Sequence, residues 1–165
     1  MLPRRSRTPT THDPARPLKL LIQRVSRSQV SVSGEVVGSI GHGYTVLVGV
    51  REGDTETDAV QLATRTVNLR VFADDDGRMN LDLLAVGGEV LAISQFTLYA
   101  DTRKGNRPGF ARAGDPAEAE RLYEAYVREL RARLGPDRVA TGAFGAAMSV
   151  EITNDGPVTI ELTSD

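Results

Sequence analysis

Short β-branched segments separated by glycine turns fill residues 19–50, and this feature restricts the fold most strongly. Ser33-Gly34-Glu35 and Gly41-His42-Gly43 supply two tight turns. The segments around them have the composition of strands: KLLIQRVS (19–26), SQVSVS (28–33), VVGSI (36–40) and YTVLVGV (44–50). We therefore expect the folded part of the chain to begin with a β-meander.

Two later segments have helical periodicity. In residues 52–70, Val60, Ala63 and Val67 share one face, and Asp54 or Thr55 is the expected N-cap. The second helix begins after the cap Asp115 and ends at Gly135-Pro136. Its apolar stripe consists of Leu122, Tyr126, Leu130 and Leu134.

Further strands are expected in the second half of the chain. Residues 87–100 have the pattern of one long buried strand, and residues 146–153 and 157–162 flank a turn at Asn154-Asp155-Gly156. A chain of 165 residues is the length of one domain. The sequence thus predicts a single α/β domain over residues 18–165, with a mixed, largely antiparallel, barrel-like sheet and two main helices.

Residues 1–17 differ from the rest in charge. Four arginines and one aspartate give them +3, so with a net charge of −2 for the whole chain the remainder carries −5. They also hold four of the eight prolines. Such a segment cannot bury enough apolar surface to order itself, and we expect a disordered tail or residues upstream of a start site near Leu18. No apolar run is long enough for a membrane span, so the expected location is cytoplasmic.

Several catalytic chemistries are excluded by residue type. The chain has no cysteine, which rules out thiolate nucleophiles, disulfides and cysteine-based zinc sites. Of its two histidines, His12 lies in the tail and His42 in a glycine turn, so neither a histidine relay nor a two-histidine metal centre is expected. Residues 74–77 lack the ligand spacing of a calcium loop and indicate a turn. No phosphate-binding glycine loop is present, and no metal or cofactor is expected.

Three polar features remain as candidates for function. Ser94-Gln95-Phe96-Thr97 interrupts an apolar strand, where unpaired polar groups would cost about 1–3 kcal/mol each, so they either bond to the backbone or line a site. In residues 154–159, Gly156-Pro157 is either an ordinary turn or a cis bond that reorients nearby carbonyls. The loop 101–114 gathers positive charge that is either solvated or anion-binding: Arg103, Lys104, Arg107 and Arg112.

Together these segments resemble the D-aminoacyl-tRNA deacylase family. The resemblance runs from Leu18 to about Leu162 and rests on LIQRVSRSQVSV, NLRVF, the acidic turn before Met79-Asn80, SQFTLYADTRKG and NDGPVT. Its two most specific motifs are SQxT (94–97) and NxGPxT (154–159), the latter including Asn154 and Thr159. Gly109 is a departure, because bacterial members often have serine there.

The resemblance implies a carboxylic ester hydrolase that removes D-amino acids from tRNA, a proofreading step in translation. It implies a homodimer with the pocket at the subunit interface and no membrane association. Gly156-Pro157 would be cis and enter the partner's pocket, where its carbonyls engage the α-amino group and leave no room for an L side chain. Arg24 would hold this segment in its orientation.

The absence of a base agrees with such a reaction, because an aminoacyl ester is already activated and the ribose 2′-hydroxyl can assist its hydrolysis. Thr97 and the backbone N–H groups at Phe96-Thr97 are the candidates for oxyanion contacts, with Ser94 and Gln95 shaping the pocket. A nucleophilic role for Thr97 stays open, although no base for it is evident. Selection by exclusion cannot reject glycine, so glycyl-tRNA is an expected substrate.

Three alternatives remain from the sequence. A non-catalytic tRNA- or RNA-binding module of the same fold would explain the basic loop, but not the polar residues at 94–97, and aromatic residues are only 5% of the chain. An editing domain like that of archaeal threonyl-tRNA synthetase would normally be fused to a synthetase. A variant subfamily that tolerates L-amino acids lacks the Gly-Pro pattern seen at Gly156-Pro157.

Overall fold

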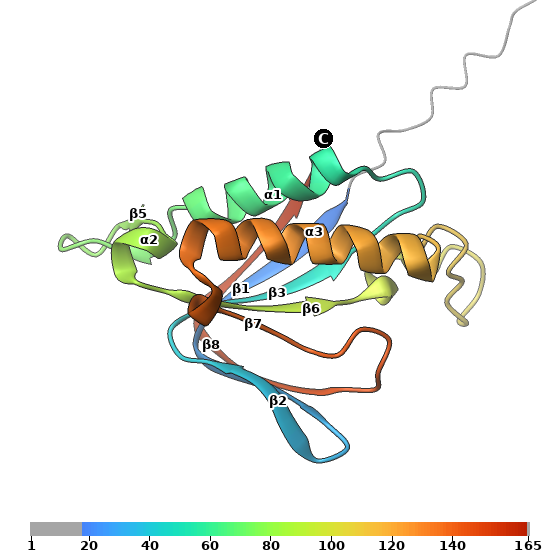
Figure 1. Cartoon of the computed structure of the whole chain (residues 1–165), viewed down its shortest axis with the longest axis horizontal. Coiled ribbons are helices and arrows are strands. Elements are labelled where there is room, and N and C mark those ends of the chain that lie inside the picture. The colour runs from blue at the N-terminus through green and yellow to red at the C-terminus, as the bar shows by residue number, and fades with distance from the viewer. Residues whose placement is uncertain (1–17, 165) are drawn as a thin grey trace, which may run out of the picture.

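The computed structural model describes residues 18–164 (Figure 1). The expectations for residues 1–17 concern a segment outside the described residues. The main sheet has six strands: β1 (Lys19–Val32), β2 (Glu35–Ile40), β3 (Gly43–Gly49), β6 (Glu89–Ser94), β7 (Val139–Thr141) and β8 (Ser149–Thr163). A separate two-stranded ribbon is formed by β4 (Phe72–Ala73) and β5 (Met79–Leu81). The helices are α1 (Glu56–Asn68), α2 (Leu83–Val86) and α3 (Pro116–Leu134), with 3-10 turns η1 (Phe96–Tyr99) and η2 (Pro136–Arg138).

The sheet is mixed and barrel-like, as the sequence predicted. Its order is β2-β1-β3-β6-β7, and β8 pairs with β1 as well. The β3–β6 and β6–β7 pairs are parallel, and the pairs that involve β1 are antiparallel. Because β1 pairs with β3 through its first half and with β2 through its second, the sheet curves, and β2 approaches β7 (Figure 1).

The two faces of the sheet bury separate cores. On the helix side, Tyr44 and Val46 of β3 pack in one cluster with side chains of α1 and α3, which lie across this face in Figure 1. On the concave side, Val25, Val30 and Leu91 belong to a second, smaller cluster. This alternation is the one that a strand with both faces covered requires. The α3 stripe is confirmed: Leu122, Tyr126, Leu130 and Leu134 are buried.

Some strand and helix boundaries differ from the predictions. The two expected strands at 19–26 and 28–33 are one strand, which continues through an irregular pairing around Ser26. Thr55 is the N-cap of α1 and forms a capping box with Asp58. The buried face of α1 includes Ala63 and Val67, whereas Val60 is only half-buried.

Two predictions around the candidate motifs were wrong in an informative way. The strand expected at 87–100 ends at Ser94, because the chain turns into η1 at Phe96. The strands expected on either side of residues 154–156 are not a hairpin. Both segments pair with β1 in the same antiparallel sense and form the single strand β8, interrupted by a bulge.

The glycine turn at His42 and the acidic turn at residues 74–77 were both expected to be ordinary turns, and their contacts are those of turns. His42 is exposed and packs edge-on against Phe72, with ring centroids 4.9 Å apart. The Asp74 carboxylate accepts hydrogen bonds from the backbone N–H groups of Asp76 and Arg78, and these bonds hold the pKa of Asp74 below its usual range. Among residues 18–164, no group of three or more histidine, cysteine or acidic side chains is placed to hold a metal.

Gly38 allows β2 to close against β7. A Cβ atom at Gly38 would lie 2.6 Å from the carbonyl oxygen of Thr141, closer than side-chain carbons approach backbone. We expect Gly38→Ala to lower the free energy of unfolding by about 1–3 kcal/mol, because the backbone must shift to admit the methyl group. Urea unfolding measures this loss.

Gly41→Ala is the matched control for this prediction. Its Cβ would meet Glu89 Oε1 at 3.5 Å, an ordinary contact. A surface change of this kind should alter the unfolding free energy by no more than about 0.5 kcal/mol. Equal stability of the Gly38 and Gly41 variants would contradict the close approach of β2 and β7.

Candidate active site

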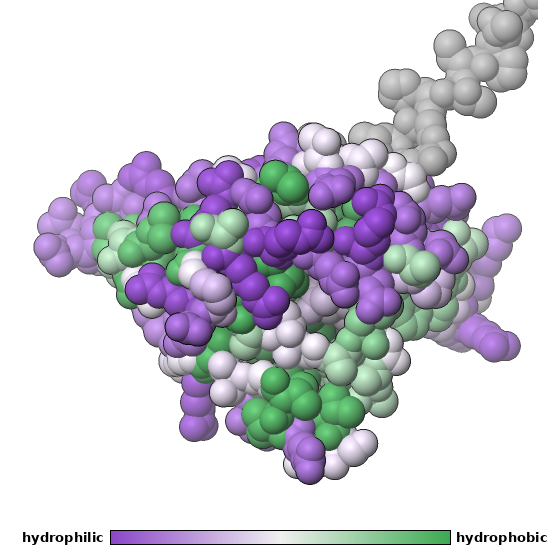
Figure 2. All heavy atoms as spheres, in the orientation of Figure 1, coloured by the Kyte–Doolittle hydropathy of each residue, from purple (hydrophilic) through white to green (hydrophobic). Residues whose placement is uncertain are grey.

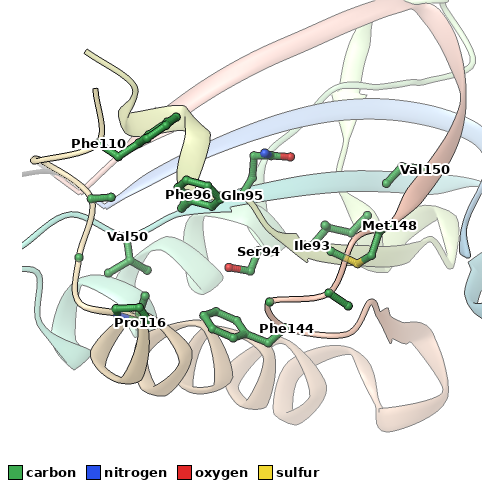
Figure 3. Close-up of a pocket in the computed structure, with 15 residues that line it drawn as sticks. Val50, Ile93, Ser94, Gln95, Phe96, Phe110, Pro116, Phe144, Met148 and Val150 are labelled. Carbon is green, nitrogen blue, oxygen red and sulfur yellow. The ribbon is translucent and has the colours of Figure 1, made fainter. Parts of the chain in front are cut away.

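A cavity of about 540 Å³ opens where β6 ends, beside the first turn of α3 and the loop before β8 (Figure 3). Fifteen residues line it, all within the described part of the chain, and none has an ionisable side chain. The wall is mainly apolar: Val50, Ile93, Phe96, Phe110, Ala113, Pro116, Ala119, Phe144, Ala146, Met148 and Val150. Ser94, Gln95, Gly114 and Gly145 complete it.

The polar interruption at Ser94-Gln95 lies at the end of β6 and enters this cavity. Gln95 N–H donates to the Val48 carbonyl at 2.8 Å, which extends the pairing with β3 by one step before the chain leaves the sheet. In Figure 3, the Ser94 hydroxyl lies within the ring of apolar side chains. The two polar residues Ser94 and Gln95 are tolerated because β6 ends there and both residues line the cavity.

Thr97 lies beside the cavity and is not part of its wall. Its side chain is exposed, and its hydroxyl accepts a hydrogen bond from Gln95 Nε2. The N–H groups of Phe96 and Thr97 are at the start of η1, and the first N–H groups of a helix have no partner within it. Ser94, Gln95 and Phe96 are thus brought to one wall, with Thr97 joined to that wall through Gln95.

Two exposed phenylalanines form one side of the cavity, and the sequence pattern identified only one of them. The Phe96 ring meets the Phe110 ring edge-on, with centroids 5.0 Å apart, and the two residues are 57% and 38% exposed. Phe110 was missed because it lies in a loop that was judged by its charges. An aromatic residue in an otherwise polar loop is the signal that could have found it. Met148 and Phe144 carried no comparable signal.

The second motif forms a bulge of four residues in β8. Gln23 of β1 pairs with Thr159 and Val25 pairs with Asn154, so residues 155–158 face Arg24 alone. The Gly156–Pro157 peptide bond is cis. Asn154 closes the base of the bulge: its Oδ1 accepts from the Val158 N–H at 2.8 Å, and its Nδ2 donates to Thr159 Oγ1 at 3.2 Å.

Arg24 holds the bulge from the neighbouring strand. Its Nε donates to the Asp155 carbonyl at 2.9 Å, and its Nη1 donates to the Val71 carbonyl at 2.5 Å. Gly156 has φ +143°, and a Cβ there would lie 2.8 Å from Val158 Cγ2. Glycine is therefore required at this position for two independent reasons.

The bulge and the cavity are separate within one chain. Ser94 pairs with Val48, which pairs with Leu20, whereas the bulge lies opposite Arg24. Four residues along β1 correspond to about 13 Å. None of the residues 154–159 is among those that line the cavity. The two motifs that look most functional in the sequence thus lie at different places in the structure.

The basic loop is partly neutralised. Asp101 and Gly109 exchange backbone hydrogen bonds of 2.7 and 2.9 Å, which close the loop between them. Arg103 lies along the Asp101 carboxylate with two hydrogen bonds, of 2.9 and 2.8 Å, and these hold the pKa of Asp101 well below its usual range. Within residues 18–164, Lys104 and Arg107 are exposed and form no ion pair.

Arg112 lies apart from the exposed tip of this loop. It is half-buried, and its carbonyl accepts a hydrogen bond from the Glu52 N–H at 3.3 Å. Among the described residues, Lys104 and Arg107 therefore have no ion-pair partner, Arg103 is paired with Asp101, and Arg112 lies beside the turn after β3. None of the helices among the described residues is long and apolar enough to cross a membrane.

Comparison with known proteins gives consistent matches. The D-Tyr-tRNA(Tyr) deacylase family model matches residues 21–163. A D-aminoacyl-tRNA deacylase of Dehalococcoides mccartyi is 55% identical over 147 residues, which is 89% of this chain and 95% of that protein. One of Thermus aquaticus is 52% identical over 147 residues, with the same coverage.

A solved structure agrees with these sequence matches. The structure of the c-Myc DNA unwinding element binding protein has a TM-score of 0.83 and 41% identity, and the match covers 87% of this chain and 97% of that one. The match to the family model contains the cavity residues 94–96, Thr97 beside them, and the bulge with its flanking residues Asn154 and Thr159. The chain belongs to the D-aminoacyl-tRNA deacylase family.

Proposed function

We propose that this protein hydrolyses the ester bond between a D-amino acid and the terminal ribose of tRNA, as a proofreading step in translation in the cytoplasm. Family membership supports the reaction. The observation that carries the assignment of the site is the pair formed by a cavity without ionisable side chains and a rigidly held Gly156-Pro157 bulge. The cavity suits an ester whose hydrolysis needs no external base, and the bulge suits selection of the substrate by shape.

The chemistry follows from what the cavity wall offers. An aminoacyl ester next to a ribose 2′-hydroxyl is an activated substrate, so positioning and oxyanion stabilisation are the main tasks left to the protein. The N–H groups of Phe96 and Thr97 are directed by η1 and serve as the oxyanion donors. The Thr97 hydroxyl is bound by Gln95, and none of the residues that line the cavity has a side chain that could act as a base, which favours an oxyanion contact over a nucleophile.

The apolar wall suits the terminal base of tRNA. A volume of about 540 Å³ falls in the range of small-ligand sites. The exposed edge-on pair Phe96–Phe110 offers aromatic surface to a flat ring. Stacking of one base on such a surface contributes about 1–3 kcal/mol. Binding of the base would bring the adjoining ester to Ser94 and the start of η1.

A homodimer would unite the two halves of the site. Within residues 18–164, β8 pairs with β1 along one edge only, although it is the longest strand, and most of its residues are exposed. A long unprotected edge is one that proteins usually cover. We propose that the Gly156-Pro157 bulge of a second copy enters the cavity, where its carbonyls bind the substrate's α-amino group and exclude an L side chain.

Deacylation of matched D- and L-tyrosyl-tRNA tests this function. The wild-type protein should hydrolyse the D ester and leave the L ester intact, and it should also hydrolyse glycyl-tRNA, since glycine has no side chain to exclude. Thr97→Ala should lower kcat by about 10²-fold, the effect of losing an oxyanion contact. Pro157→Ala should lower D-tyrosyl-tRNA deacylation and also reduce the preference for D over L, because the bulge carbonyls both bind the α-amino group and exclude an L side chain. Resistance of both D-tyrosyl- and glycyl-tRNA would instead indicate a non-catalytic RNA-binding module.

The basic loop provides a second test. Lys104→Ala and Arg107→Ala should each weaken tRNA binding and reduce the slope of log K against log salt by about 1, because each removes one phosphate contact. Arg78→Ala is the control, since Arg78 is an exposed arginine of the β4–β5 turn, at the opposite end of the molecule in Figure 1. An equal effect of all three variants on the slope would show non-specific charge attraction and contradict a contact made by this loop.

A further inference from the structure

The Met79-Asn80 motif after the acidic turn has no role in the site described above, and its geometry is irregular. Phe72 of β4 pairs with Leu81 of β5, and Ala73 pairs with Met79, so Asn80 is an extra residue in β5. A bulged residue of this kind redirects its side chain out of the regular ladder. The Asn80 side chain is therefore free to make contacts that a regular strand would not allow.

Asn80 joins the acidic turn to Arg70. Its Nδ2 donates to Asp74 Oδ2 at 3.1 Å. The backbone carbonyl of Asn80 accepts a hydrogen bond from Arg70 Nε at 2.8 Å, and the side-chain Oδ1 accepts a second one from Arg70 Nη2. The Asp74 carboxylate is itself fixed by two backbone N–H groups of the turn, at 2.9 and 3.0 Å. Two nitrogen atoms of the Arg70 guanidinium group are thus bound to Asn80, and the Asn80 side chain is bound in turn to the acidic turn.

Arg70 immediately precedes the residue that holds Arg24. The Val71 carbonyl accepts from Arg24 Nη1 at 2.5 Å, and Arg24 Nε donates to the Asp155 carbonyl, the residue before Gly156. The Arg24 side chain is only 14% exposed, and its hydrogen bond to the Val71 carbonyl is partly buried, whereas its hydrogen bond to the Asp155 carbonyl is exposed. A continuous series of hydrogen bonds and one peptide link therefore runs from Asn80 to the bulge.

We propose that Asn80 is a positioning residue for chiral selection, acting through Arg70, Val71 and Arg24 on the Gly156-Pro157 bulge. This inference rests on the proposed function. Without the Asn80 side chain, Arg70 keeps only the backbone carbonyl of residue 80 as an acceptor, and the side-chain link from Arg70 to Asp74 is lost. Arg24 then has a less fixed partner, and the bulge it orients can shift. Small displacements of groups that contact substrate have large kinetic effects.

The ratio of kcat/KM for D-tyrosyl-tRNA to that for L-tyrosyl-tRNA tests the proposal. Asn80→Ala should lower this ratio roughly tenfold while KM for tRNA stays close to the wild-type value, because the change affects the bulge and not the tRNA contacts. Asp75→Ala is the matched control. Asp75 lies exposed in the same turn, and no hydrogen bond or ion pair of its side chain is seen among residues 18–164. This variant should keep the wild-type ratio.

An exchange of the two partners separates positioning from general stability. Asn80→Asp alone places two carboxylates together, and Asp74→Asn alone places two amides together, so each should lower the ratio. The double variant Asp74→Asn, Asn80→Asp restores one donor and one acceptor between the two side chains, and it keeps an oxygen for Arg70. It should recover the ratio to within about threefold of the wild-type value.

The outcomes distinguish this proposal from the proposed function. If the wild-type protein does not hydrolyse D-tyrosyl-tRNA, the proposed function fails. If it does, an unchanged D-to-L ratio in Asn80→Ala, or an equal loss of both activities, overturns the positioning role. Should Asn80→Ala fail to fold, as circular dichroism would show, the exchange decides: a double variant no more selective than its two single variants also overturns the role.

Discussion

The arrangement of this molecule depends on how a four-residue bulge is kept rigid in the middle of a β-strand. Residues 155–158 leave the β1–β8 ladder, so the sheet itself cannot hold their backbone groups. Asn154 replaces the lost pairing from within β8, and Arg24 of β1 replaces it with one hydrogen bond to the Asp155 carbonyl, while a second hydrogen bond ties Arg24 to the Val71 carbonyl. Arginine suits this task because its planar fork reaches two carbonyls in fixed directions. The bulge is thereby ordered although it projects from the sheet.

The cavity is defined by the absence of ionisable side chains from its lining. Its wall holds hydroxyl, amide and aromatic groups but no ionisable side chain, so it can bind an activated ester without supplying a base. On the proposed function, selectivity then has to come from the shape of the bulge, which in the same chain is on β8, three strands from β6, and is offset from Ser94 by about 13 Å along β1. On the proposed function, separate elements carry the chemistry and the selection. A dimer that brings them together gives the exposed strand β8 a partner as well.

The sequence predicted the composition of this site better than its geometry. The α3 stripe and the caps Asp115 and Thr55 obey local rules, so the helices could be placed from residue spacing alone. The end of β6 at Ser94 was missed because an apolar run on both sides imitates one long strand. Residues 154–156 were expected to be a turn between two strands, because Asn-Asp-Gly-Pro satisfies turn chemistry, and only the partner strand β1 reveals that they belong to a bulge within one strand. The bidentate Asp101–Arg103 pair likewise cannot be read from net charge.

Subunit complementation tests the central claim most directly. On the proposed function, Thr97→Ala impairs the oxyanion contact beside the cavity, and Pro157→Ala impairs the bulge. A mixed dimer of the two variants would contain one site with both defects and one site with neither, if the bulge of each copy serves the cavity of the other. Unfolding and refolding a mixture of the two weakly active proteins should therefore restore D-selective deacylation well above that of either protein alone. Activity of the mixture equal to the average of the separate variants would contradict a site shared between subunits.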